Sequence, residues 1–397
     1  MTMNPLRTNI GIAIDGGGIR GLIIARALMT LETELGCKPL INHPQIRILA
    51  GTSTGAILTG VLALGMEADA IARVYREVGQ QVFHPLTPAW FPGWLKGIVE
   101  LLFTFFRRSL YSNKKLIRVL RKEIKKQTGN PDFTLAELNE RIGPDKVLIL
   151  TVVNITERRT HFLKSDNPAD GQWKLWEAIL ASSSVPPALP VWARNESGKQ
   201  YYTDGGVGSY GNPAYIVAKE ATVFRGYNPS EVSILSFGTG WLNAANFEKQ
   251  YHSPTSWRGL DWATNAPILF GADTIRTQSL DILENPGTNA IDFRRFQFEL
   301  EKDFATDAYQ DDATYAFMEQ KGDELGIRIA NNQFASEGCD PKYDPEGLFT
   351  LLSKYRAAKY PKKHQTPQKG NGPALHIVEA APTDEFSTTK QKMNIEK

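Results

Sequence analysis

The feature that most constrains this chain is the stretch at residues 46–55, with the sequence IRILAGTSTG. Residues 46–50 are mostly apolar and predict a buried strand, and residues 56–64 have an apolar helical pattern. Between them, Gly51-Thr52-Ser53-Thr54-Gly55 matches the G-x-S-x-G pattern of a nucleophile elbow. Because such a turn is sharp, little room remains for side chains beside the serine. The stretch predicts Ser53 as a nucleophile, with an ordinary serine in a glycine-rich turn as the alternative.

Strand patterns alternate with helical patterns along the chain. A strand at residues 9–14 leads into a glycine loop at 15–21 and a helix at 22–35, the same order that surrounds Ser53. Further strands are predicted at 147–154 (with a hairpin partner at 160–163), 200–203 and 232–237, and further helices at 67–78, 107–126, 133–141, 174–181, 212–221, 260–283 and 311–331. This alternation is typical of an α/β fold with a mainly parallel sheet and helices on both faces.

Composition limits the class of protein. The chain has 397 residues, a net charge of +2 and two cysteines, Cys37 and Cys339, which are too few for a disulfide framework or a metal cluster. A charge so close to zero gives no indication of a nucleic-acid polymer as partner. The N-terminus lacks a signal-peptide pattern, and no uncharged apolar run reaches 18 residues. We therefore expect a cytoplasmic protein, with peripheral contact to a membrane left open.

Three glycine-bearing loops each follow a predicted strand, at residues 15–21, 51–55 and 204–206. In an open parallel sheet such loops meet at the carboxyl edge, where ligands bind. A serine nucleophile needs a base and an oxyanion hole. Asp204 is a candidate for the base, and residues 16–18 are candidates for the oxyanion hole because glycine lets backbone N–H groups approach a carbonyl closely. The alternative for Asp204-Gly205-Gly206 is a plain turn.

The glycine loop also permits a different hypothesis. Gly16, Gly18 and Gly21 fit the G-x-G-x-x-G fingerprint of dinucleotide binding, which requires an acidic residue near the end of the next strand. That strand ends in residues 51–55, which carry no carboxylate. The dinucleotide hypothesis is therefore disfavoured, and we expect no cofactor.

A Ser-His-Asp hydrolase is the nearer rival. Of the six histidines, only His252, His364 and His376 follow Asp204, as the chain order of an α/β-hydrolase requires. His252 is the one credible candidate, and a histidine in a surface loop is its alternative. The elbow here follows the second predicted strand, which is earlier in the chain than in a usual α/β-hydrolase. This early position favours a two-residue site in which a carboxylate takes the serine proton directly.

Four blocks in order resemble the patatin-like phospholipases: residues 15–21 (DGGGIRG), 51–55 (GTSTG), 181–187 (ASSSVPP) and 204–206 (DGG). The resemblance is clearest over residues 9–240. It implies a three-layer α/β/α fold without a metal or cofactor, and cleavage of acyl esters of phospholipids or other lipids through an acyl-enzyme. By position it implies Ser53 as nucleophile, Asp204 as base and an oxyanion hole beside Arg20, which would hold the loop. The oxyanion hole would be formed by Gly16, Gly17 and Gly18, and the other motif positions are Gly51, Gly55, Gly205 and Gly206.

The remaining segments are assigned by composition. We expect a catalytic domain at residues 1–358 that includes a helical extension at 256–331, followed by a flexible tail at 359–397. Residues 83–126 are first aromatic and then basic, and residues 107–126 carry nine basic residues against one acidic residue, Glu123. Such a segment suits contact with anionic lipid. The alternative is a pair of buried helices that cap the active site.

These patterns leave three hypotheses of function. The first is a hydrolase that cleaves acyl esters of phospholipids or lysophospholipids. The second is the same activity held off until a small molecule binds, because some bacterial patatin-like proteins are nucleotide-triggered effectors in antiphage defence. The third is a lipid-binding module without catalysis, against which the intact Ser53 and Asp204 argue.

Overall fold

The computed structural model describes residues 3–82, 111–186, 188–195, 198–302 and 312–359. The chain divides into a compact unit, Met1–Tyr355, and a short C-terminal unit, Arg356–Lys397. Of the second unit only the last turn of one helix is described. The expected aromatic segment at residues 83–106 and nearly all of the expected tail at 359–397 lie outside the described residues.

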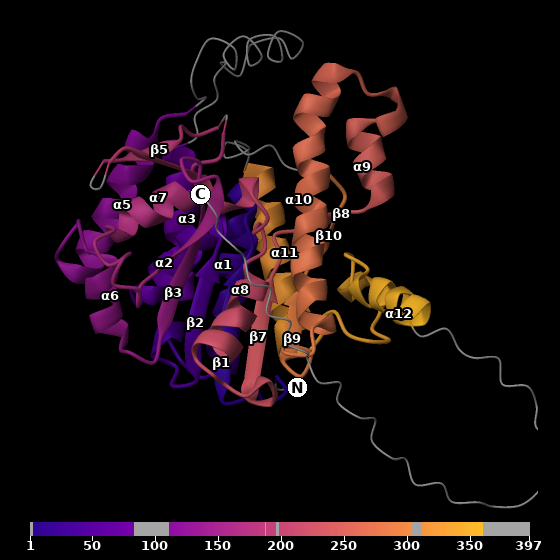
Figure 1. The fold of residues 1–397 in the computed structure, drawn as a ribbon, viewed down its shortest axis with the longest axis horizontal. Helices are drawn as coiled ribbons and strands as arrows, with labels where there is room; N and C mark the ends of the chain where they lie inside the picture. The colour runs from indigo at the N-terminus through magenta and orange to yellow at the C-terminus, as the bar shows by residue number, and fades with distance from the viewer. Residues whose placement is uncertain (1–2, 83–110, 187, 196–197, 303–311, 360–397) are drawn as a thin grey trace, which may run out of the picture. The chain divides into compact units, whose positions relative to one another are not determined.

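The centre of the first unit is an eight-stranded sheet in the order β5-β6-β3-β2-β1-β7-β9, with β4 paired to β3 (Figure 1). Strands β1, β2, β3, β7 and β9 are parallel to one another, whereas β4, β5 and β6 join through antiparallel pairs. The strands are β1 (Asn9–Ile14), β2 (Ile46–Gly51), β3 (Val147–Asn154), β4 (Arg159–Lys164), β5 (Trp192–Arg194), β6 (Gln200–Asp204), β7 (Val232–Phe237) and β9 (Asp292–Phe296). The expected mainly parallel sheet is confirmed.

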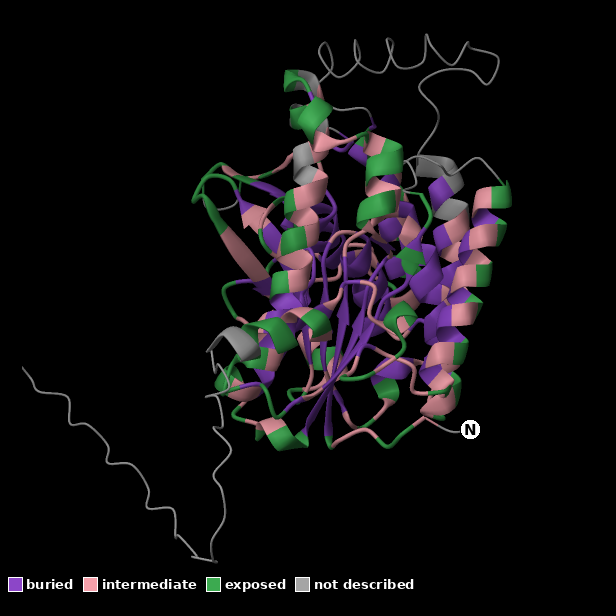
Figure 2. Cartoon of the chain, turned by 90° about the vertical axis from the view of Figure 1, so that its right-hand side faces the viewer, coloured by how far each residue is buried: buried purple, intermediate pink, exposed green. Residues whose placement is uncertain are grey.

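Helices cover both faces of this sheet. On one face, α1 (Gly21–Glu34), α2 (Thr54–Ala63), α3 (Ala68–Val82), α5 (Asn113–Thr128), α6 (Leu135–Ile142), α7 (Leu175–Ser182) and α11 (Asp312–Ala330) form the larger core. On the other, α8 (Ala214–Lys219) and α10 (Gly259–Glu284) form a smaller one. In β1, Ile12 faces the first core and Ala13 the second, as the alternation of side chains along a strand requires. Figure 2 shows the buried strands between helices that expose their outer faces. The fold is the expected α/β/α sandwich.

Local signals in the sequence account for several element ends. Thr134 caps α6, and Glu137 returns the hydrogen bond to complete a capping box. Gly36 follows α1 at a φ of 61°, a conformation that glycine adopts without strain. One prediction was too long: α8 gives way at Glu220 to a π-helical turn, Glu220–Phe224, instead of continuing to residue 221 as an α-helix.

Several elements carried no clear signal in the sequence. They are β5, β9, α9 (Ala244–Tyr251), α12 (Leu348–Lys359), and the small ladder of β8 (Trp241–Leu242) with β10 (Glu299–Leu300). Of these, β9 matters most for the site. It lies between α10 and α11, in a stretch between two predicted helices for which no strand was predicted, and it extends the central sheet beside β7.

Candidate active site

Ser53 occupies a strained turn between β2 and α2. Its φ of 56° and ψ of −121° lie where residues other than glycine are rarely found. A Cβ added at Gly51 would lie 2.2 Å from the carbonyl oxygen of Gly55, and one added at Gly55 would lie 2.1 Å from that of Ile14. The glycines on either side of the serine are therefore required by close backbone packing, as the sequence predicts.

Asp204 ends β6, and its carboxyl is buried, with 2% of the residue exposed. Its Oδ1 accepts a hydrogen bond of 2.7 Å from the N–H of Gly206, whereas Oδ2 is buried and accepts none of ordinary geometry. Burial raises the pKa of this carboxyl to about 6, although the nearby Ser53 hydroxyl and the Gly206 N–H lower it. The structure thus brings together the serine and the aspartate singled out in the sequence, although the two residues are far apart along the chain.

The third sequence block, at the end of α7, holds both of these residues. Ser182 Oγ accepts a hydrogen bond of 3.2 Å from the N–H of Ser53, and Ser183 Oγ donates one of 3.1 Å to the Ser53 carbonyl. The carbonyl of Ser184 accepts from the N–H of Asp204 at 3.2 Å and from Thr203 Oγ1 at 2.7 Å. Three consecutive serines therefore connect the elbow to the strand of the aspartate, a role that the sequence alone did not indicate.

The glycine loop lies beside the elbow, since a Cβ at Gly16 would be 3.1 Å from the Cβ of Ser53. Within the loop the three candidate donors differ. The Gly16 N–H donates to the carbonyl of Gly211 at 3.0 Å, whereas the N–H groups of Gly17 and Gly18 donate to no described residue. Arg20 Nε donates to the Gly17 carbonyl at 3.3 Å, so this side chain supports the loop from within. Within the described structure, two N–H groups near Ser53 thus remain available to a ligand.

The loop is also fixed from two outer sides. Thr239 Oγ1, just beyond β7, donates to the Gly16 carbonyl at 2.6 Å. On the opposite side the Tyr75 hydroxyl of α3 donates to the Gly18 carbonyl and is hydrogen-bonded to Thr54 Oγ1. With their neighbouring carbonyl oxygens held in this way, Gly17 and Gly18 have little freedom to reorient their N–H groups.

A buried ionic cluster supports the first residue of the loop, and the sequence analysis missed it. Arg295 of β9 is fully buried and donates to both oxygens of Asp15, at 2.9 and 2.6 Å, and to Glu346 at 2.6 Å. The two carboxylates raise the pKa of Arg295, although burial opposes them, while burial raises the pKa of Asp15 to about 6 against the effect of Arg295. A contact across 280 residues leaves no local pattern by which it could have been found.

The histidine that could have replaced Asp204 lies elsewhere. His252 follows α9 as its C-terminal cap and is exposed. No described residue that lines the pocket next to Ser53 is a histidine. In the described part of the chain, no three His, Cys, Asp or Glu side chains converge as metal ligands.

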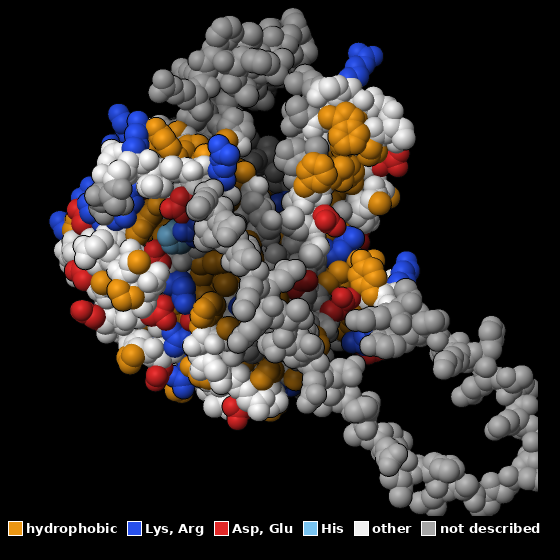
Figure 3. All heavy atoms as spheres, in the orientation of Figure 1, with side chains coloured by type: hydrophobic (Ala, Val, Ile, Leu, Met, Phe, Trp, Pro, Cys, Tyr) orange, Lys and Arg blue, Asp and Glu red, His pale blue; other side chains and the backbone are white. Residues whose placement is uncertain are grey.

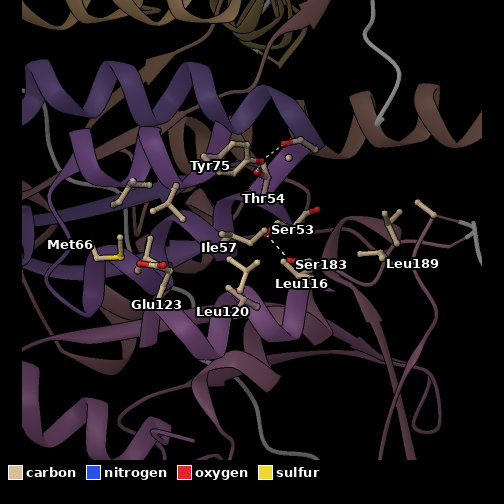
Figure 4. Close-up of a pocket in the computed structure, with 18 residues that line it drawn as sticks. Ser53, Thr54, Ile57, Met66, Tyr75, Leu116, Leu120, Glu123, Ser183 and Leu189 are labelled. Carbon is tan, nitrogen blue, oxygen red and sulfur yellow. Dashed lines mark hydrogen bonds between the residues drawn. The ribbon is translucent and has the colours of Figure 1, made fainter. Parts of the chain in front are cut away.

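A pocket opens beside Ser53 and runs between α2, α3 and α5 (Figure 4). Its polar lining includes Ser53, Thr54 and Gly18, and aliphatic side chains such as Ile57, Leu116 and Leu120 form most of the wall. Such a lining is suited to a hydrocarbon chain.

Several known proteins are similar in sequence to parts of this chain, and three of them are described here. Calcium-independent phospholipase A2-gamma of Rattus norvegicus is 26% identical over 66% of this chain and 32% of its own length. The cGAMP-activated phospholipase of Vibrio cholerae is 28% identical over 57% of this chain and 63% of its own length. Patatin-17 of Solanum cardiophyllum is 24% identical over 81% of this chain and 82% of its own length. The chain thus spans about a third of the length of the Rattus norvegicus protein and just under two thirds of the length of the Vibrio cholerae protein.

The family model described as patatin-like phospholipase matches residues 12–218. This range contains the glycine loop, the serine elbow, the three serines at the end of α7 and Asp204. The match covers more than half of the chain and agrees with the resemblance of the four blocks. The chain belongs to the patatin-like phospholipase family.

Proposed function

We propose that this protein is a serine hydrolase that cleaves acyl esters of phospholipids or lysophospholipids with Ser53 and Asp204 as a catalytic dyad. One observation carries the proposal. A serine in a strained elbow lies beside a buried carboxyl whose Oδ2 has no other partner among the described residues. A carboxylate with a pKa of about 6 is ionised at neutral pH and remains basic enough to accept a proton.

The reaction follows from these positions. Asp204 accepts the proton of the Ser53 hydroxyl while Oγ attacks the ester carbonyl, and the N–H groups of Gly17 and Gly18 stabilise the negative charge that develops on the carbonyl oxygen. Collapse of the tetrahedral intermediate breaks the ester bond, and the protonated Asp204 gives its proton to the departing alkoxide. Water then attacks the acyl-enzyme with Asp204 again as base, which releases a fatty acid and restores Ser53.

The test is lipid product analysis with the wild type, Ser53→Ala and Asp204→Asn. Both variants should lose release of fatty acid by at least about 1,000-fold, because each removes a group that takes part in bond making. A fluorophosphonate probe should label the wild type but not Ser53→Ala. Near-normal turnover of Asp204→Asn, together with loss of turnover in His252→Ala, would overturn the dyad. Failure of the probe to label Ser53 would instead favour a lipid-binding module.

A second function, ligand-activated lipid cleavage, is favoured by the match to the Vibrio cholerae protein named a cGAMP-activated phospholipase. We propose that a small molecule of the nucleotide class raises the activity of this chain. The measurement is fatty-acid release from vesicles with and without cyclic dinucleotides. Full activity without any nucleotide, unchanged when one is added, contradicts the proposal.

Peripheral contact with a membrane belongs to the same proposal. No helix in the described ranges is long and apolar enough to cross a bilayer. Basic side chains of α5 are exposed to solvent, among them Lys114, Arg118, Lys122 and Lys125. On α10, Trp262 and Phe270 are 45% and 65% exposed, and Figure 3 shows hydrophobic side chains gathered over α9 and α10. Exposed cations suit anionic headgroups and exposed aromatic rings suit the interfacial region.

A further inference from the structure

The wall of the pocket beside Ser53 includes a carboxyl group, that of Glu123, which neither the proposed chemistry nor the support of the elbow and the glycine loop uses. Its walls are otherwise aliphatic over most of their extent, and its volume is about 80 Å³. Glu123 of α5 lies in this wall near Met66, at a distance from Ser53 in the view of Figure 4, with Ile57 and Leu120 between them. A carboxyl group in such surroundings requires an explanation.

The position of Glu123 on its helix is unusual. It is the only acidic residue of α5, a helix with seven lysines and arginines, yet it is 7% exposed while several of these cations face solvent. Leu116, Leu120 and Glu123 follow the spacing that places side chains on one helix face. The glutamate therefore belongs to the apolar stripe that lines the pocket and not to the charged surface of the helix.

The carboxyl group of Glu123 has one oxygen without a hydrogen-bond donor within the described structure. Its Oε2 is buried and without a partner. A neighbouring cation is used elsewhere, since Arg121 pairs with Asp132 at 2.9 Å. A buried polar oxygen without a donor costs free energy, so an unpartnered group at the wall of a substrate pocket is a site that a ligand can satisfy.

We propose that Glu123 selects acyl chains that carry a hydroxyl group along the hydrocarbon. This inference rests on the proposed acyl-ester hydrolysis and specifies its substrate class. An apolar chain extending from the ester carbonyl at Ser53 would contact Ile57 and Leu120 and then reach Glu123. A hydroxyl at that point donates a hydrogen bond to Oε2 of the carboxyl, whereas a plain methylene leaves this oxygen unpartnered. A charged group would instead lose its hydration against a wall that is otherwise aliphatic.

The experiment compares matched esters with plain chains and with one hydroxyl moved stepwise along the chain. For the wild type, the kcat/KM ratio of hydroxylated to plain ester should pass through a maximum of about 10-fold to 100-fold at one hydroxyl position, as expected for a hydrogen bond to a buried polar group. Glu123→Met, which has similar length and no polar oxygen, should bring this ratio to about one and improve plain chains. Glu140→Met is the matched control, because Glu140 is an exposed glutamate of the neighbouring helix α6, and it should keep the wild-type ratio.

Two measurements separate this role from others. Glu123→Met should unfold at the same temperature as the wild type or higher, since it removes an unpartnered buried carboxyl. Binding of hydroxylated and plain fatty acids to Ser53→Ala, measured by calorimetry, should show the same preference without any turnover. If that preference appears but no ester is cleaved by the wild type, the proposed hydrolysis fails and the selectivity stands. If Glu123→Met keeps the wild-type ratio, or the wild type has no preferred hydroxyl position, the selectivity is overturned.

Discussion

At the scale of single residues, the central property is a carboxyl group whose burial costs stability and raises its basicity. The pKa of Asp204 lies near 6 in the folded protein, above the ordinary value of 3.8. Between these two pH values the folded state holds a proton that the unfolded state has lost. Stability therefore falls as pH rises through this window, and the full cost is present above pH 6.

Asp204→Asn should for this reason stabilise the protein while it abolishes activity. Two pKa units correspond to about 3 kcal/mol, so we expect the variant to gain about 1–3 kcal/mol at pH 8 and almost nothing at pH 4. Urea unfolding at the two pH values measures the difference. Equal stability of wild type and variant at pH 8 would show that burial of the ionised Asp204 carboxyl does not lower the free energy of unfolding.

The same carboxyl predicts the pH profile of the reaction. Only the ionised form can accept the Ser53 proton, so kcat/KM should rise tenfold per pH unit below about pH 6 and level off above it. Titration of released fatty acid with a short-chain ester avoids any effect of pH on vesicles. An inflection near pH 7 that disappears in His252→Ala would point to a histidine base.

Ser53 provides a separate test of backbone strain. Glycine adopts the Ser53 conformation without a Cβ penalty, whereas alanine does not. Ser53→Gly should be more stable than Ser53→Ala by about 1 kcal/mol, although both lack the nucleophile. Thermal unfolding of the two inactive variants makes the comparison independent of activity. If alanine is the more stable substitution, the elbow is not strained.

At the scale of elements, the sequence predicted what is encoded locally and missed what is encoded by distant contacts. The elbow and the glycine loop were found because each is a short run whose glycines are required by close packing. Strand β9 was missed because its sequence, DFRRF, places two arginines in a strand that turns out to be buried. Those arginines are tolerated because acceptors surround them, among them the carboxylates of Asp292, Asp15 and Glu346. Nothing in residues 292–296 indicates the distant partners.

The ionic cluster on β9 should be a stability determinant of the glycine loop. Arg295→Met leaves Asp15 and Glu346 buried without their shared cation, and we expect a loss of about 3–5 kcal/mol in the free energy of unfolding. Glu346→Gln keeps the Arg295–Asp15 pair and should cost clearly less. Denaturant unfolding measures the loss in the free energy of unfolding for each variant. A larger loss for Glu346→Gln than for Arg295→Met would contradict a supporting role for Arg295 at the loop.

At the scale of the whole molecule, charge and exposed apolar surface bear on the proposed contact with a lipid surface. Lys114→Gln with Lys122→Gln should weaken binding to anionic vesicles by about 30-fold, since each basic residue near such a surface contributes about 1 kcal/mol. The matched control is Lys38→Gln with Lys354→Gln, which removes two exposed lysines outside α5, α9 and α10. Vesicle sedimentation at fixed salt measures both pairs. If the two pairs weaken binding equally, the exposed cations of α5 have no special role.

The three serines at the end of α7 also bear on how such a chain can change over evolution. Ser182 and Ser183 hold the backbone of Ser53, and Ser184 holds that of Asp204, so three adjacent residues connect the backbones of these two residues. None of these bonds involves α5 or α6, the two helices that precede β3. Insertions at the ends of these two helices could therefore be accepted without altering the positions of Ser53 and Asp204, so new specificities can be acquired around an unchanged pair of residues.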